Sequence, residues 1–98
     1  MSLQNKNAIV TGGAKGIGKG CVEVFHREGA NVIILDRDQA GQQLAHTLGQ
    51  KVRFFHCDVS QERQVKTAVE KAVETFGEIS RICDYLLPMR KQAFGTGY

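Results

Sequence analysis

Residues 11–18 read Thr11-Gly12-Gly13-Ala14-Lys15-Gly16-Ile17-Gly18, between the apolar run 8–10 and a segment with helical periodicity. This order predicts a strand, a glycine-rich turn and the start of a helix. Gly12 and Gly16 let the backbone turn tightly and approach a phosphate with no Cβ in the way, and Gly18 lets the helix pack closely on the strand. The free N–H groups and the positive dipole end of the helix then face a pyrophosphate. The stretch therefore predicts a phosphate-binding loop, with a glycine-rich turn that holds no ligand as the alternative.

The glycine spacing, Gly12-x-x-x-Gly16-x-Gly18, differs from the usual G-x-G-x-x-G dinucleotide fingerprint. Written as T-G-x-x-x-G-I-G, it resembles the cofactor loop of the short-chain dehydrogenase/reductase family. The resemblance implies a nicotinamide dinucleotide cofactor and assigns five residues to its binding: Gly12, Lys15, Gly16, Ile17 and Gly18. The strand before the loop, the helix after it and an acid at a suitable distance favour this interpretation over an empty turn.

Asp36 ends a second buried strand, 31–36, and lies 18 residues after Gly18. That interval is close to the roughly 20 residues at which a dinucleotide site places its ribose-binding carboxylate. A carboxylate there accepts hydrogen bonds from the ribose 2′-OH and 3′-OH and repels a 2′-phosphate, which favours NAD over NADP. In the resembling family, basic residues at the positions of Lys15 and Arg37 accompany NADP use. A phosphate dianion beside a carboxylate nevertheless costs more than a flexible cation returns, so NAD is the expected cofactor. A helix N-cap or a solvated strand end is the other interpretation of Asp36.

A third strand, 52–57, is followed by Asp58 and Val59. The resembling family carries an Asp-Val pair at this point, where the carboxylate accepts from the adenine amino group and the next backbone N–H reaches the ring. The resemblance therefore implies that Asp58 and Val59 form the adenine pocket. The alternative is that Asp58 is an acid ahead of a helix capped by Ser60.

Three helices are predicted from apolar periodicity and from glycines that follow them. The apolar faces expected to lie on the sheet are Ile17, Cys21, Val24 and Phe25 in 16–28; Ala40, Leu44, Ala45 and Leu48 in a helix that Arg37 or Asp38 opens; and Val65, Ala68, Val69, Ala72, Val73 and Phe76 in 61–76. The order is β-α-β-α-β-α, so the predicted fold class is α/β: a partial Rossmann fold with a doubly wound parallel sheet and three αβα layers, truncated. One edge of strand 7–11 is then left unpaired, which predicts aggregation or a partner.

The resemblance stops near residue 80, which predicts a partial NAD-binding domain over 1–80 and an irregular tail over 81–98. Family members transfer hydride with a Ser, a Tyr-x-x-x-Lys pair and an Asn. Lys91 is six residues after Tyr85 and Pro88 intervenes, so this pair is rejected and no catalytic residue is assigned. We expect a truncated form of an NAD-dependent oxidoreductase, with a hydroxysteroid as one candidate substrate, that is inactive by itself. The alternative is a non-catalytic NAD-binding or interaction module that pairs with a full-length homologous subunit through its open sheet edge.

Composition and cysteine spacing bear on nucleic-acid binding, membrane insertion and metal binding. The 98 residues carry a formal net charge of +3, without a basic stripe interleaved with aromatics, so nucleic-acid binding is not expected. Contact of the basic tail, Arg90 and Lys91, with nucleic acid or acidic lipid is a third hypothesis. No apolar run approaches 18 residues and the start lacks a signal-peptide pattern, so no membrane span and a cytoplasmic location are expected. The spacing of Cys21, Cys57 and Cys83 argues against a zinc site and a disulfide framework, and the three histidines are scattered, so no metal is expected.

Overall fold

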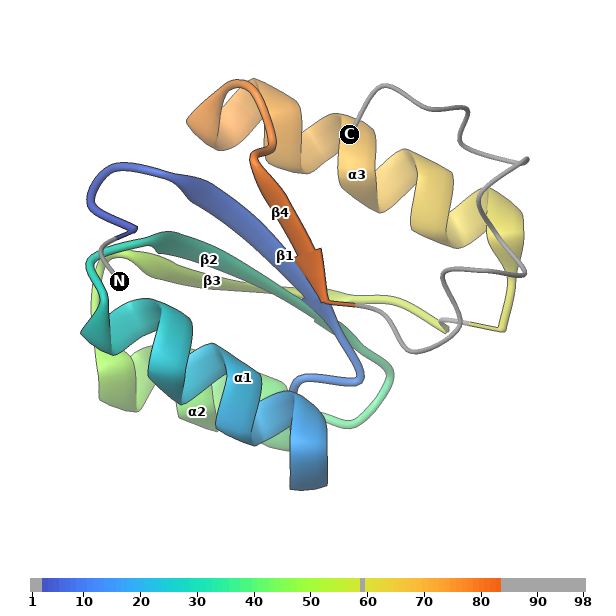
Figure 1. Ribbon diagram of the computed structural model, residues 1–98. Coiled ribbons are helices and arrows are strands. Elements are labelled where there is room, and N and C mark those ends of the chain that lie inside the picture. The colour runs from blue at the N-terminus through green and yellow to red at the C-terminus, as the bar shows by residue number, and fades with distance from the viewer. Residues whose placement is uncertain (1–2, 59, 84–98) are drawn as a thin grey trace.

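The structure, a computed structural model, describes residues 3–58 and 60–83. Its elements, in chain order, are β1 (Asn7–Thr11), α1 (Gly16–Arg27), β2 (Asn31–Asp36), α2 (Ala40–Leu48), β3 (Val52–His56), α3 (Glu62–Phe76) and β4 (Arg81–Cys83). The strands form one parallel sheet in the order β3-β2-β1-β4. Helices α1 and α2 cover one face of this sheet and α3 covers the other (Figure 1). The predicted layered α/β arrangement is therefore confirmed.

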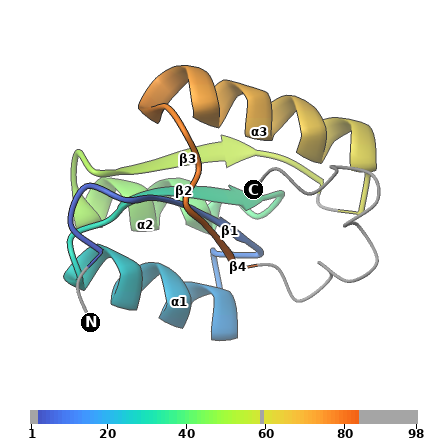
Figure 2. The same cartoon turned by 45° about the horizontal axis from the view of Figure 1, so that its top comes forward.

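Burial of both sheet faces explains why β1 and β2 read as nearly continuous apolar runs. Side chains alternate along a strand, so neighbouring residues enter different layers. Ile9, Ile33 and Leu35 pack with the apolar side of α3, whereas Val10 and Ile34 pack with α1 and α2. Figure 2 shows the three layers from a second direction. Two apolar clusters, one on each face, therefore bury the central strands from both sides.

Helix α1 buries a different face from the predicted one. Val22 is the fully buried residue of this helix, and Cys21 and Phe25 are partly buried beside it. Ile17 is 87% exposed and Val24 is 39% exposed, so the prediction that both lie on the sheet is wrong. A helix turns about 100° per residue, so Val24 and Ile17 lie about 160° and 140° around the helix axis from Val22, on the side that faces away from the sheet.

Helix α2 also departs from the prediction in detail. It begins at Ala40, and the Asp38 carboxylate accepts the Ala40 N–H at 2.9 Å from just outside the helix. Ala40 is exposed, so the prediction that it lies on the sheet is wrong, and Gly41 is buried instead. The helix packs so closely on the Phe54 ring at Gly41 that a Cβ there would overlap the ring. Gly49 ends the helix with a φ of 105°, as expected of a glycine stop.

Strand β4 pairs with the side of β1 that was expected to be open. Its register joins Ala8 to Arg81, Ile9 to Ile82 and Val10 to Cys83, so the prediction of an unpaired β1 edge is wrong. Irregular structure was also predicted from residue 81, and the first three residues of that segment are instead a strand. Residues 84–98, with Tyr85 and Lys91, lie outside the described residues, and the division into 1–80 and 81–98 stays a prediction. Among the described residues, every helix is too short or too polar to cross a membrane.

Candidate functional site

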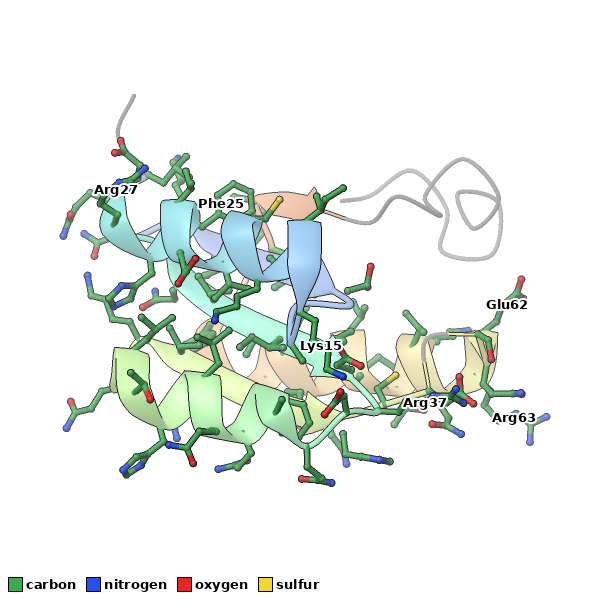
Figure 3. The ribbon with its side chains drawn as sticks, turned by 90° about the horizontal axis from the view of Figure 1, so that it is seen from below. Lys15, Phe25, Arg27, Arg37, Glu62 and Arg63 are labelled. Atoms are coloured by element: carbon green, nitrogen blue, oxygen red, sulfur yellow. The ribbon has the colours of Figure 1, made fainter. Side chains whose placement is uncertain are left out.

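Three loops meet at the carboxyl end of the parallel sheet. Because β1 and β2 are adjacent, with Thr11 opposite Leu35, the glycine-rich loop 12–15 lies beside the loop 37–39 that follows β2. The Gly12 N–H donates to the Leu35 carbonyl at 2.7 Å and joins the two strand ends. Figure 3 shows the side chains of Lys15 and Arg37 at this end of the molecule. Cys57 and Asp58, directly after β3, lie at the same edge, which is where open α/β sheets bind ligands.

The glycines of the first loop meet the predicted backbone requirements. Gly12 and Gly16 have φ of 66° and 58°, in the left-handed region that residues with a Cβ adopt at a cost. A Cβ on Gly18 would overlap the carbonyl oxygen of Gly12, so the start of α1 packs on the loop itself. A Cβ on Gly16, in contrast, would meet no described atom within 4 Å. The loop is therefore tightly closed on its inner side and open on the side of Gly16.

The start of α1 suits an anion. Its first turn, Gly-Ile-Gly-Lys, contains no acidic residue, and the side chain of the preceding Lys15 makes no capping hydrogen bond. The first N–H groups of a helix have no partner within the helix and carry a partial positive charge. A pyrophosphate would satisfy them, so the loop fits the phosphate group of a dinucleotide.

Asp36 is held against the glycine-rich loop. One carboxylate oxygen, Oδ2, accepts the Ala14 N–H at 3.1 Å, and the other, Oδ1, accepts the Asp38 N–H at 3.0 Å. An ionised carboxylate offers about four acceptor positions, so two donors leave room for ribose hydroxyls. The structure therefore brings the glycine-rich loop and Asp36 together, although Ala14 and Asp36 are 22 residues apart in the sequence.

Two ion pairs span the site. Lys15 Nζ lies 2.6 Å from Asp38 Oδ2, and Arg37 lies 3.9 Å from Asp58 Oδ2. The hydrogen bond from Lys15 and the Ala40 N–H hold the pKa of Asp38 below its ordinary value. The same hydrogen bond and the charge of Asp38 raise the pKa of Lys15, and the charge of Asp36 adds to that effect. Both basic residues named as NADP determinants thus face acids.

Asp58 builds a turn ahead of α3. Its Oδ1 accepts the Ser60 hydroxyl at 2.6 Å and the Ser60 N–H at 3.0 Å, while its own N–H donates to Gln64 Oε1 at 2.9 Å. The Ser60 hydrogen bonds hold the pKa of Asp58 below its ordinary value. Helix α3 begins at Glu62, and the Ser60 side chain bonds to Asp58 instead of capping the helix. Val59 lies outside the described residues, and the adenine pocket of Asp58 and Val59 stays a prediction.

Sequence reasoning did not single out Asp38 as a site residue. The only available signal was an acid two positions after Asp36. Parallel pairing of the strands before the two loops would put this acid near Lys15. Within residues 3–58 and 60–83, no group of three or more His, Cys, Asp or Glu side chains could hold a metal ion.

A parallel sheet with this strand order, a glycine-rich loop after β1 and an acid after β2 defines a dinucleotide-binding α/β fold. Residues 6–84 match the family model described as short chain dehydrogenase. The chain belongs to that family.

Known proteins that resemble the chain agree with this assignment. It is 47% identical over 78 residues to (+)-borneol dehydrogenase 1 of Salvia officinalis, covering 79% of this chain and 30% of that one. It is 46% identical over 78 residues to (21S)-21-acetoxyl-apo-melianone synthase of Melia azedarach, covering 79% and 29%. Among solved structures, a 3-ketoacyl-(acyl-carrier-protein) reductase from Brucella melitensis, complexed with NADH, superposes with a TM-score of 0.79 at 35% identity, covering 83% and 34%. The chain thus spans about 30% of the length of these plant relatives.

Proposed function

We propose that the described residues hold the adenosine and pyrophosphate part of a nicotinamide dinucleotide, with NAD preferred, for an oxidoreductase that acts on alcohol or carbonyl groups. The observation that carries the proposal is the hydrogen bond between the Ala14 N–H and the Asp36 carboxylate, at 3.1 Å. It puts a hydroxyl acceptor directly beside the loop that fits a phosphate. The NADH named with the Brucella melitensis reductase supports the same class of ligand.

Each part of the site has a role in the proposal. Gly12, Gly16 and Gly18 give the loop its shape, and the N–H groups at the start of α1 take the pyrophosphate. Asp36 accepts the ribose hydroxyls, and Asp58 with Val59 lines the adenine end. The remaining residues assigned to the cofactor, Lys15, Ile17 and Arg37, border the same edge.

The charges around Asp36 favour NAD. Lys15 and Arg37 lie at ion-pair distance from Asp38 and Asp58, so neither cation is uncompensated. Together with Asp36, the five groups sum to a net charge of −1. A 2′-phosphate, which carries nearly two negative charges at neutral pH, would enter a site that already has a negative excess.

The chemistry on the substrate is assigned to no side chain of this chain. The dinucleotide supplies the hydride that such enzymes transfer, and the described residues bind and orient it. A hydroxysteroid is one substrate of this alcohol or carbonyl class, and borneol is the alcohol named for the Salvia officinalis relative. Activity would then require groups beyond the described site, with a full-length homologous subunit as one source.

Isothermal calorimetry on the 98-residue chain tests the proposal. NAD is expected to bind at least about tenfold more tightly than NADP. Asp36→Asn is expected to weaken NAD binding about tenfold or more, since a hydrogen bond to a charged group contributes about 1.5 to 3 kcal/mol. Glu70→Gln is the matched control, because it removes the same charge from the exposed side of α3 and is expected to leave binding unchanged. A folded circular-dichroism spectrum with no heat on addition of either dinucleotide would contradict the proposal.

A further inference from the structure

The closest ion pair of the site joins its two central loops. Lys15 comes from the glycine-rich loop and Asp38 from the loop after β2, and their Nζ and Oδ2 atoms are 2.6 Å apart. The Lys15 side chain is 74% exposed and that of Asp38 is 35% exposed, so the contact lies at the rim, where a ligand would enter. The charge of Asp36 also contributes to the raised pKa of Lys15.

Backbone hydrogen bonds position Asp38 independently of Lys15. Its Oδ1 accepts the Ala40 N–H at 2.9 Å at the start of α2, and its own N–H donates to Asp36 Oδ1 at 3.0 Å. The carboxylate is therefore held by backbone on one side and presents Oδ2 to Lys15 on the other. Arg37 has a looser partner, since its guanidinium is 3.9 Å from Asp58.

A lysine at this rim could otherwise bind phosphate. Its ammonium is a compact charge on a flexible stem that reaches several positions. A cation already paired at 2.6 Å has much of its charge compensated and is held toward its acid, so it attracts a phosphate less strongly than an unpaired lysine would. The acid that holds the lysine therefore affects which dinucleotide binds without touching either one.

We infer that Asp38 is a specificity-determining residue, which pairs with Lys15 and so withholds that cation from a 2′-phosphate. Discrimination against NADP then has two sources. Asp36 repels the phosphate directly, and Asp38 acts through Lys15. The inference rests on the proposed dinucleotide site and adds to it a residue that acts at the same rim.

The pair stays charged across neutral pH. The pKa of Asp38 is held below its ordinary value mainly by the Lys15 hydrogen bond, and the pKa of Lys15 is raised mainly by Asp38. Both groups are therefore ionised between about pH 5 and pH 9. The masking of Lys15 does not depend on pH in that range.

The test measures dissociation constants for NAD and NADP by calorimetry at one fixed, low ionic strength. The variants are Asp38→Asn, Lys15→Gln and the two combined, each made in the native chain and in Asp36→Asn. Asparagine keeps an oxygen for the Ala40 N–H, and circular dichroism checks that each variant is folded. Glu70→Gln again controls for a general change of net charge.

Asp38→Asn is expected to tighten NADP binding about two- to fivefold, the range that corresponds to an exposed ion pair, and to change NAD binding less than about twofold. When Asp38→Asn is made in the Asp36→Asn variant, the gain in NADP affinity should be at least as large, because Asp36 no longer repels the 2′-phosphate. In combination with Lys15→Gln the gain should disappear, since the released cation is absent.

Two results would overturn the inference while leaving the proposed function intact. One is that the native chain binds NAD and that Asp38→Asn leaves the preference for NAD over NADP unchanged. The other is an equal NADP gain with and without Lys15, which would mean that Asp38 acts by simple repulsion. Binding of neither dinucleotide by the native chain would overturn the proposed function and this inference together.

Discussion

The two ends of the parallel sheet use polar side chains in opposite ways. At the amino end, Asn7 begins β1 with 9% of its surface exposed, and its Nδ2 donates to the carbonyls of Phe76 and Glu78, both at 2.9 Å. Its Oδ1 accepts from Asn31 Nδ2, also at 2.9 Å, at the start of β2. At the carboxyl end, Asp36 and the pair of Lys15 and Asp38 lie at a solvent-accessible rim.

The difference lies in how much bonding capacity remains. The two Asn7 amide protons are both used, so this side chain ties β1 to the end of α3 and the approach to β4. The Asp36 carboxylate uses two of about four acceptor positions. The amino end therefore contributes to the stability of the fold, whereas the Asp36 carboxylate at the carboxyl end keeps acceptor positions unused.

The largest expected effect on this contrast comes from Asn7→Ala. It removes three hydrogen bonds and leaves two carbonyls without their donor in a half-buried setting, so the free energy of unfolding should fall by about 2 to 3 kcal/mol. Urea denaturation measures the loss. Asn31→Ala, which removes one of the three bonds, should cost less, and NAD affinity of the folded fraction should not change. A large loss of NAD affinity in folded Asn7→Ala would show that the two ends are not independent.

The next effect compares two glycines of α1. A Cβ at Gly18 would overlap the Gly12 carbonyl oxygen, whereas one at Gly20 would meet no described atom within 4 Å. Gly18→Ala should therefore displace the loop, lower stability by about 1 to 2 kcal/mol and weaken NAD binding about tenfold or more. Gly20→Ala should raise stability by about 0.5 to 1 kcal/mol, since alanine is the better helix former, and leave binding unchanged. Equal effects of the two substitutions, by calorimetry and urea denaturation, would contradict the assigned packing of the loop.

Sequence reasoning predicted the parts that depend on local pattern. The bounds of β1 and β2 follow from buried apolar runs, and the position of Asp36 follows from its distance to the glycines. Strand β4 was missed because three residues carry too little pattern, and its pairing with β1 is a tertiary contact. The face of α1 was wrong because exposed Ile17 and Val24 supply an apolar period of their own.

The polar contacts were beyond the sequence for a different reason. The Asn7 amide bonds to carbonyls 69 and 71 residues away, and no residue type signals a carbonyl partner. The pairing of Lys15 with Asp38 needs the parallel register of β1 and β2, which brings the two loops together. Type and spacing thus identified Lys15 and Asp36 as candidates, whereas the roles of Asn7 and Asp38 depended on partners that only the fold supplies.

The smallest expected effect is a difference in how the stability of the two sheet ends responds to low pH. The Ser60 hydrogen bonds hold the pKa of Asp58 below its ordinary value, so the folded state binds this proton less readily than the unfolded chain does. The ionised Asp58 therefore stabilises the fold fully at a pH above its pKa in the unfolded chain, about 3.9. This stabilisation is lost as the pH falls through the lower pKa of the folded state. Native chain and Asp58→Asn should differ in urea denaturation midpoint at pH 6 and converge toward pH 2. Asn7 has no titratable group, so the deficit of Asn7→Ala should stay nearly constant over the same range. An Asp58→Asn deficit that grows on acidification would mean that its carboxylate is destabilised in the fold, which would contradict the Ser60 hydrogen bonds as its main interaction.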